Sequence, residues 1–384
     1  MIPYGRQLIS PQDIQAVVDV LHSDFLTQGP CVPEFEKSLT EYTGAKHALA
    51  CNSATSALHL ACLALELQHG DIVWTSPNTF VASANCALYC NASIDFVDID
   101  PNTYNMSISC LEKKLVLAKA EKLLPKIIIP VHLCGQSCDM EKIYALSLEY
   151  GFKIIEDASH AIGGKYKNNP VGGCQFSDIT IFSFHPVKII TSGEGGAALT
   201  NNADLANKMN MMRTHGITNQ PNLMSKMPED EIWNYQQILL GFNYRMTDIQ
   251  AALGNSQLSK IDNFIAGRHK LALNYSQQLD QEKFQLPFQH PDSCSSFHLY
   301  PILIMESSIQ LSQKKIFQIL RDAGIAVNLH YIPVYRHPFY INMGFSPGLC
   351  PAAEDYFRRT ITIPLFPSLS ENDQQFIIDT LNAI

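Results

Sequence analysis

The chain has 384 residues, 46% of them hydrophobic, and a formal net charge of −9. This length exceeds what one small core needs, so the sequence predicts two domains. Because the charge is negative and no basic block occurs, nucleic acid is excluded as an expected partner. Residues 1–7 lack the apolar core of a signal peptide, and no apolar run is long enough to cross a bilayer, so we expect no membrane association.

Eleven cysteines, an odd number, are scattered through apolar stretches. This pattern is typical of reduced, buried thiols and predicts a cytoplasmic protein. His132, Cys134 and Cys138 would make a partial zinc site, but a second ligand pair at suitable spacing is missing and Gly135 introduces a turn. We therefore expect a strand end and a loop there, and no metal.

Short apolar runs alternate with helix-like segments in the first half of the chain. The predicted buried strands are 71–75, 94–97, 126–131, 152–155 and 179–184, and the predicted helices are 56–67, 80–89, 109–118 and 139–150. This alternation predicts an α/β domain with a mostly parallel sheet. The run 197–200, after two glycines, predicts a strand that returns beside 179–184 and makes the sheet mixed.

The pattern changes after Gly254. A long amphipathic helix over 257–279 leads to a strand over 297–305, a helix over 312–323 and a closing helix over 371–384. These elements predict a smaller α/β domain at the C-terminus. We expect a large domain over 1–255, including the N-terminal segment, and a small domain over 256–384. The polar, irregular segment 219–230 predicts a mobile loop over a site.

Two groups of residues in the large domain predict an anion site and a buried acid. Ser53, Ala54 and Thr55 lie where a loop enters the predicted helix 56–67. Unpaired backbone N–H groups and the helix dipole bind anions there, although a simple Ser/Thr cap gives the same pattern. Asp157 follows a strand at the sheet edge where ligands of open α/β sheets bind. Its carboxylate would pair with a cation such as a protonated pyridine, or cap the next turn.

Lys188 follows the predicted strand 179–184 in a tight, glycine-containing segment. Desolvation at such a place lowers a lysine pKa and makes the amine nucleophilic, although a solvated loop lysine is the alternative. Pyridoxal phosphate (PLP) requires three binding groups: a phosphate-binding site, an acid for the ring nitrogen and a Schiff-base lysine. The sequence offers all three, in this order.

With these motifs in order, the sequence resembles the sugar aminotransferases of the DegT/DnrJ type, in the fold-type I aspartate aminotransferase superfamily. The resemblance runs nearly end to end and includes Leu26-Thr27-Gln28-Gly29, 52–57, 77–82, 157–164, 183–188, 194–196, 241–248 and His298-Leu299-Tyr300-Pro301. It implies the fold-type I PLP-dependent transferase fold, a large domain with a mostly parallel mixed sheet plus a smaller C-terminal α/β domain. Segments 26–29, 297–303 and 328–335 are most similar to enzymes that aminate a UDP-4-keto-6-deoxy-L-hexosamine on the route to pseudaminic acid.

The resemblance implies a role for each matching residue. Lys188 would carry PLP covalently, with pyridoxamine phosphate as the intermediate; Asp157 would pair with the pyridine nitrogen; and His160 would lie beside the phenolic oxygen. Phe80 would stack on the ring, where a core position is the alternative. The phosphate would be held by Ser53, Ala54, Thr55 and Ser183, and by Asn243 of a second subunit, which implies a homodimer. The nucleotide-sugar pocket would be lined by Tyr4, Asp24, Phe25, Leu26, Thr27, His330 and Tyr331. Leu133-Cys134 departs from the small or aromatic pair often found in relatives.

The implied reaction moves an amino group from an amino acid, glutamate by resemblance, to the 4-keto carbon of the UDP-linked sugar. Lys188 would act first as base and then as acid. Three alternatives stay open. In the first, the enzyme is an aminotransferase for another keto sugar, one that is D-configured, dTDP-linked or aminated at the 3-position. Relatives that act as 3-dehydratases replace the lysine by histidine, and Lys188 argues against that activity. A non-catalytic nucleotide-sugar-binding relative is the third.

Overall fold

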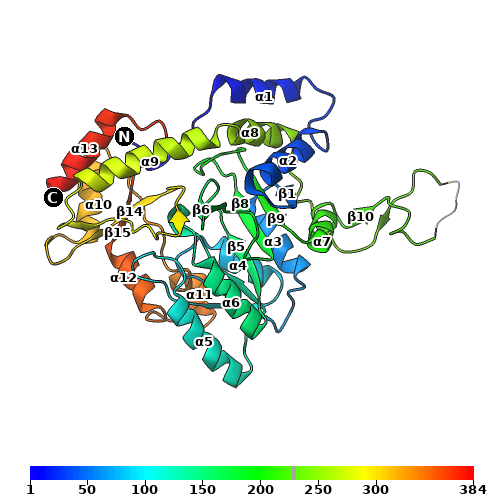
Figure 1. The fold of residues 1–384 in the computed structure, drawn as a ribbon, viewed down its shortest axis with the longest axis horizontal. Helices are drawn as coiled ribbons and strands as arrows, with labels where there is room; N and C mark the ends of the chain where they lie inside the picture. The colour runs from blue at the N-terminus through cyan, green and yellow to red at the C-terminus, as the bar shows by residue number, and fades with distance from the viewer. Residues whose placement is uncertain (227–230) are drawn as a thin grey trace.

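The computed structural model describes residues 1–226 and 231–384 (Figure 1). Within them, the central sheet has the strand order β1-β9-β8-β5-β4-β2-β3. Its strands are β1 (His47–Cys51), β9 (Gly196–Thr200), β8 (Ile179–Ser183), β5 (Lys153–Asp157), β4 (Ile127–Ile129), β2 (Ile72–Thr75) and β3 (Ser93–Phe96). The five strands from β8 to β3 run parallel, and β9 runs antiparallel to both of its neighbours. The predicted α/β fold with a mostly parallel, mixed sheet is confirmed.

Helices cover both faces of this sheet because its strands are apolar on both sides. Along β4, Ile127 and Ile129 pack into one core and Ile128 into another, as the alternation of a strand requires. The first core also holds α3 (Ala54–Ala64), α4 (Ala82–Tyr89) and α7 (Ala203–Arg213). The opposite face carries α5 (Ile108–Glu121) and α6 (Met140–Tyr150) and, further along, α2 (Cys31–Thr43) and α8 (Asp248–Leu258). Burial of both faces of the sheet explains why its strands are continuous runs of β-branched residues.

A second core lies toward the C-terminus (Figure 1). Its sheet has the order β12 (Phe284–Gln285), β14 (Tyr300–Ile304), β15 (Thr360–Ile363), and the helices α9 (Ile261–Gln278), α10 (Gln313–Asp322) and α13 (Glu371–Asn382) pack against it. The predicted strand 297–305 and the two predicted C-terminal helices form here. Ile2 pairs with Ile325, so the first residues touch this second core. We keep the domain boundary at 255/256 as a proposal.

The predicted helix over 257–279 is confirmed as α9, although it begins four residues later than expected, at Ile261. The preceding helix, α8, ends at Leu258. Lys260, between the two, leaves helical geometry (φ −113°, ψ 4°), and its ammonium pairs with the buried Asp13 of α1 (Pro11–Leu21), 2.5 Å away. α8 packs on α1, and α9 packs against the second core.

The predicted loop 219–230 is part of an arm. β10 (Ile217–Thr218) pairs with β11 (Gln236–Gln237) near its base, and Figure 1 shows the arm projecting away from the sheet rather than over it. The rest of this predicted loop, 227–230, lies outside the described residues. Shorter elements complete the fold: β6 (Lys165–Tyr166), β7 (Asn169–Pro170), β13 (Ser293–Cys294), α11 (Pro338–Asn342) and α12 (Pro351–Arg359). No helix in the described parts of the chain is both long and apolar enough to cross a membrane.

Candidate active site

A cavity of about 840 Å³ opens where β5, β8 and the starts of α3 and α4 meet. Segments far apart in the sequence contribute to it. Tyr4 comes from the start of the chain, and His330 lies beside the small C-terminal sheet, where it contacts Thr362 of β15. Most of the predicted site residues line this one cavity: Tyr4, Ser53, Ala54, Thr55, Phe80, Asp157, His160, Ser183, Lys188, His330 and Tyr331.

The start of α3 presents backbone N–H groups to the cavity. Ser53 caps the helix, and its hydroxyl accepts a hydrogen bond from the Ser56 N–H at 3.1 Å. Gly196 at the start of β9 lies against this turn, because a Cβ added there would be 2.3 Å from the Ala54 nitrogen. Only glycine allows this approach of β9 to the helix start. Ala54 and Thr55 are therefore free to bind an anion at the positive end of the helix dipole.

Lys188 enters the cavity from the segment after β8. Burial lowers the pKa of its ammonium to about 8, while the negative charge of Asp157 acts in the opposite direction. Lys188 is half-buried there, and its role as a Schiff-base lysine stays a prediction. A lysine with this pKa releases its proton far more readily than one in water.

Asp157 ends β5 and is 5% exposed. The Ser159 N–H donates to its Oδ1 at 3.1 Å, and the Ser83 hydroxyl donates to its Oδ2 at 2.5 Å. Thr79 is hydrogen-bonded in turn to Ser83, at 2.7 Å. Sequence reasoning missed Ser83 and Thr79, although Thr79 lies within the motif 77–82 that it had used and Ser83 follows that motif directly.

Phe80 is 60% exposed at the cavity. A core aromatic would be buried, so the alternative that Phe80 serves only the core is wrong. An exposed ring beside a polar cavity is available to stack on a flat ligand.

The two ring nitrogens of His160 are hydrogen-bonded to Cys134 and Tyr331. The Cys134 N–H donates to His160 Nδ1 at 3.3 Å, and Nε2 lies 3.2 Å from the Tyr331 hydroxyl. Burial, followed by the charges of Lys188 and His330, holds the pKa of His160 well below its usual value. The ring is therefore neutral, its proton is on Nε2, and it donates to Tyr331. The hydroxyl proton of Tyr331 is left for a ligand.

Two further imidazoles belong to the small C-terminal part. Burial lowers the pKa of His330 to about 3, and its Nδ1 lies 3.0 Å from the Thr362 hydroxyl. His298 also lines the cavity, and its buried Nδ1 has no hydrogen-bond partner among the described residues. His298 is part of the motif 298–301, but the motif alone predicted no role for it. Burial also holds the pKa of His298 well below its usual value, so both rings are neutral. The ring nitrogens of His330 already contact Thr362 and the side-chain amide of Asn328, so His298 is the ring with a nitrogen left unpaired among the described residues.

The predicted residues Asp24, Phe25, Leu26 and Thr27 do not line this cavity within one chain. Thr27 pairs with Thr247, and the Gly29 N–H donates to Asp248 Oδ2 at 2.5 Å. This pairing holds the segment beside Thr247 and Asp248, and Asp24 and Phe25 line a separate cavity against α1, α2 and α8. Asn243 is exposed and also lies outside the Lys188 cavity.

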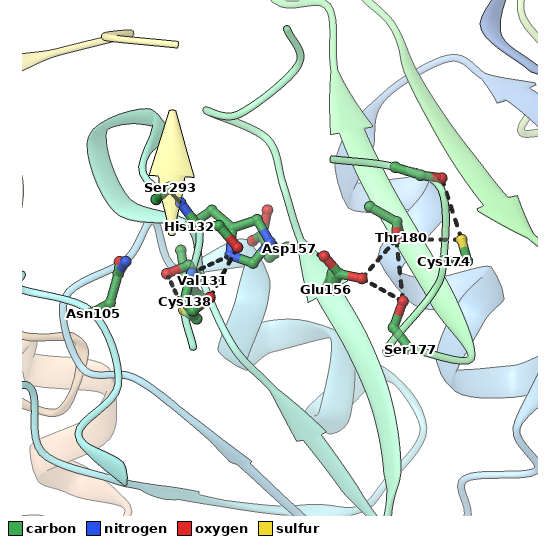
Figure 2. Close-up of polar contacts among 12 residues, drawn as sticks. Asn105, Val131, His132, Cys138, Glu156, Asp157, Cys174, Ser177, Thr180 and Ser293 are labelled. Carbon is green, nitrogen blue, oxygen red and sulfur yellow. Dashed lines mark hydrogen bonds and ion pairs between the residues drawn. The ribbon is translucent and has the colours of Figure 1, made fainter. Parts of the chain in front are cut away.

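The other side of β5 carries a second polar network, shown in Figure 2. His132 Nε2 lies 2.9 Å from Glu156, and Ser177 and Thr180 donate to the same carboxylate. The Cys138 N–H donates to His132 Nδ1, so the predicted strand end and loop are present here. In the described residues, no three or more His, Cys, Asp and Glu side chains are grouped to hold a metal ion.

Comparisons with known proteins agree with this arrangement. A Campylobacter jejuni protein named UDP-4-amino-4,6-dideoxy-N-acetyl-beta-L-altrosamine transaminase is 38% identical over 385 residues, which cover 100% of this chain and 97% of the relative. The structure of Helicobacter pylori PseC, an aminotransferase involved in the biosynthesis of pseudoaminic acid, superposes with a TM-score of 0.87 at 33% identity, covering 99% and 98% of the two chains. Spr1654 of Streptococcus pneumoniae, solved in a PLP form, gives a TM-score of 0.88 at 30% identity over 100% and 98%. Residues 7–382 match the DegT/DnrJ/EryC1/StrS aminotransferase family, and the chain belongs to that family of enzymes.

Proposed function

We propose that this enzyme is a PLP-dependent aminotransferase that converts a UDP-linked 4-keto-6-deoxy-N-acetylhexosamine to the 4-amino sugar, with glutamate as the donor, in pseudaminic acid biosynthesis. The observation that carries the proposal is the cavity in which Lys188, with its pKa lowered to about 8, lies near the buried carboxylate of Asp157. A nucleophilic amine and a fixed anion in one cavity are the pair that a pyridine aldehyde requires.

The rest of the cavity fits PLP. Gly196 lets β9 approach the start of α3 so closely that a Cβ would meet the Ala54 nitrogen at 2.3 Å, which leaves a cradle for a phosphate at Ser53, Ala54, Thr55 and Ser183. The exposed face of Phe80 would stack on the ring. When bound, PLP would supply an electron sink for the negative charge that develops at the donor's α-carbon.

The protein's own side chains would then move the protons. Lys188 Nζ would take a proton from the donor's α-carbon in the first half-reaction and deliver one to C4 of the sugar in the second. Its lowered pKa suits both directions near neutral pH. Asp157, as an anion, would keep the ring nitrogen protonated, and His160 would orient the Tyr331 hydroxyl toward the bound molecules.

The choice of sugar rests on the relatives and on the polarity of the cavity. The C. jejuni and H. pylori proteins carry names from pseudaminic acid chemistry. His298 and the Tyr331 hydroxyl offer uncharged hydrogen-bonding groups suited to sugar hydroxyls, and the Tyr4 ring lies 5.4 Å from the His330 ring, between centroids. A volume of about 840 Å³ is large enough for a cofactor together with a sugar.

We also propose a homodimer with shared active sites. Lys188 is the only lysine or arginine among the described residues that line the cavity, and a diphosphate and the donor's carboxylates need further cations. Asn243 and the segment Asp24–Thr27 both lie outside the Lys188 cavity of their own chain, and we assign them to the cavity of the second subunit. The arm exposes Ile232 (92%), Trp233 (73%) and Leu240 (78%), as an interface does before assembly. An active, PLP-loaded monomer in sedimentation would contradict this.

A cytoplasmic location is the remaining part of the proposal. All eleven cysteines lie in the described residues and none forms a disulfide, as expected of a reducing compartment. Fractionation of the source cells, with the protein recovered outside the cytoplasm, would refute it.

The experiment uses the purified protein with glutamate and enzymatically prepared UDP-4-keto-6-deoxy-L-N-acetylhexosamine, and follows the product by mass. We expect an amine in place of the ketone. Lys188→Ala should abolish the product yet still bind pyridoxamine phosphate, whereas Lys113→Ala, an exposed lysine on α5, should leave turnover unchanged.

Two other outcomes correspond to the alternatives. Turnover only with a D-configured, dTDP-linked or 3-keto sugar would keep the aminotransferase and replace the substrate. Binding of cofactor and nucleotide sugar with no conversion of either substrate would indicate a non-catalytic relative and refute the proposed reaction.

A further inference from the structure

We infer that Ser83 and Thr79 are positioning residues that hold Asp157 as an anion against the ring nitrogen of the cofactor. This inference deepens the proposed function and rests on it. It concerns a contact, Ser83 Oγ to Asp157 Oδ2 at 2.5 Å, that joins the start of α4 to the end of β5.

The direction of the hydrogen bonds follows from the number of protons. Ser83 has one hydroxyl proton, and its three possible acceptors are Asp157 Oδ2 at 2.5 Å, the Thr79 hydroxyl at 2.7 Å and the Phe80 carbonyl at 3.4 Å. The Ser83 hydroxyl therefore donates to the closest acceptor, the charged Asp157 Oδ2. Ser83 must then accept from Thr79, whose hydroxyl lies 2.7 Å away. The chain of donors runs from Thr79 through Ser83 to the carboxylate, and each bond polarises the next.

This chain lies where hydrogen bonds are strong. Ser83 is 0% exposed and Thr79 is 3% exposed. Away from water, a hydrogen bond to a carboxylate has little competition, and leaving the carboxylate without it is costly. Ser83 is also in the first turn of α4, whose dipole favours a nearby negative charge.

The geometry leaves room on Asp157 for the ring. A carboxylate accepts about four hydrogen bonds. Ser159 occupies Oδ1 and Ser83 occupies Oδ2, so each oxygen keeps a free lone pair while the plane of the group is fixed. The segment that carries Ser83 also carries Phe80, so one turn would set both the ring's plane and the partner of its nitrogen.

The test separates this role from a general loss of stability. Binding of PLP, and of the PLP analogue with a carbon in place of the ring nitrogen, is measured by titration of apoprotein prepared from wild type, Ser83→Ala and Thr79→Val. For Ser83→Ala we expect about tenfold weaker binding of PLP, the loss that one charge-assisted hydrogen bond accounts for, and less than about a twofold change for the analogue. Thr79→Val should show the same selectivity with a smaller loss.

Ser147→Ala is the matched control, because Ser147 is also buried and donates to a backbone carbonyl, at 2.7 Å within α6. It should lower thermal stability without changing binding of either compound. An equal loss for both compounds in Ser83→Ala would reduce Ser83 to a structural residue and overturn the inference, as would no loss for PLP. If wild type failed to distinguish the two compounds, the pairing of Asp157 with the ring nitrogen would fall; if it bound neither, the proposed function would fall.

Discussion

The lowered pKa of Lys188 leads to a quantitative prediction about how the cofactor-free protein captures PLP. Only the neutral amine attacks an aldehyde. With a pKa of about 8, about one Lys188 in ten is neutral at pH 7, compared with about one in 3,000 for a lysine with the usual pKa of 10.5. The reactive fraction is therefore about 300-fold larger than in a solvated lysine.

The pH dependence follows from the same value. Burial disfavours the charged form, so the amine loses its proton at lower pH. The rate of capture should rise about tenfold per pH unit up to about pH 8 and then level off. The assay mixes apoprotein with PLP, stops the reaction with borohydride at set times, and quantifies the modified Lys188 peptide by mass, which ignores surface lysines.

The variant Asp157→Asn tests the direction in which the charge of Asp157 shifts the pKa of Lys188. The negative charge of Asp157 raises the pKa of Lys188, so removing it should move the midpoint of the pH profile below that of wild type. A capture rate that kept rising through pH 10, or a midpoint that moved upward in Asp157→Asn, would show that burial does not control this lysine.

Three further predictions concern the cradle, the stacking face and the fold. Gly196→Ala should weaken PLP binding at least tenfold, because its Cβ would meet the Ala54 nitrogen at 2.3 Å; unchanged affinity by titration would be incompatible with the cradle. Phe80→Ala should weaken PLP binding about two- to tenfold, while thermal unfolding changes little since the ring is 60% exposed. Burial alone would raise the pKa of Asp13, but hydrogen bonds led by Lys260 lower it from 3.8 to about 2. Asp13→Asn should thus cost about 2 kcal/mol of stability at neutral pH, and urea unfolding should show this difference vanish as the pH falls through about 2.

Local patterns predicted the parts of the site that are continuous in sequence. The buried strands, the capped start of α3 and the lysine after β8 each depend on residues within a few positions of one another. These features therefore carry their own signal. In the central sheet, the ends of the predicted strands lie within two residues of those in the structure, whereas the predicted strand 297–305 begins three residues before β14.

Contacts between distant segments left no such signal. Ser83 and Asp157 are separated by 74 positions, and the only hint was a pair of hydroxyls on either side of Phe80. At the break between α8 and α9, Lys260 reaches Asp13, 247 positions away, and no local pattern announces that contact. The capping box at Thr247 and Gln250 was a readable start signal for α8 that was not used.

The two adjacent carboxylates of β5 limit where residues can be inserted into the chain or deleted from it. Glu156 faces His132, Ser177 and Thr180, while Asp157 faces the cavity. Because strand residues alternate, inserting or deleting one residue within β5 would exchange the two faces and present the wrong acid to the cavity. The chain would keep every chemical group that it needs and still lose its activity. Length variation among homologues should therefore be absent from β5.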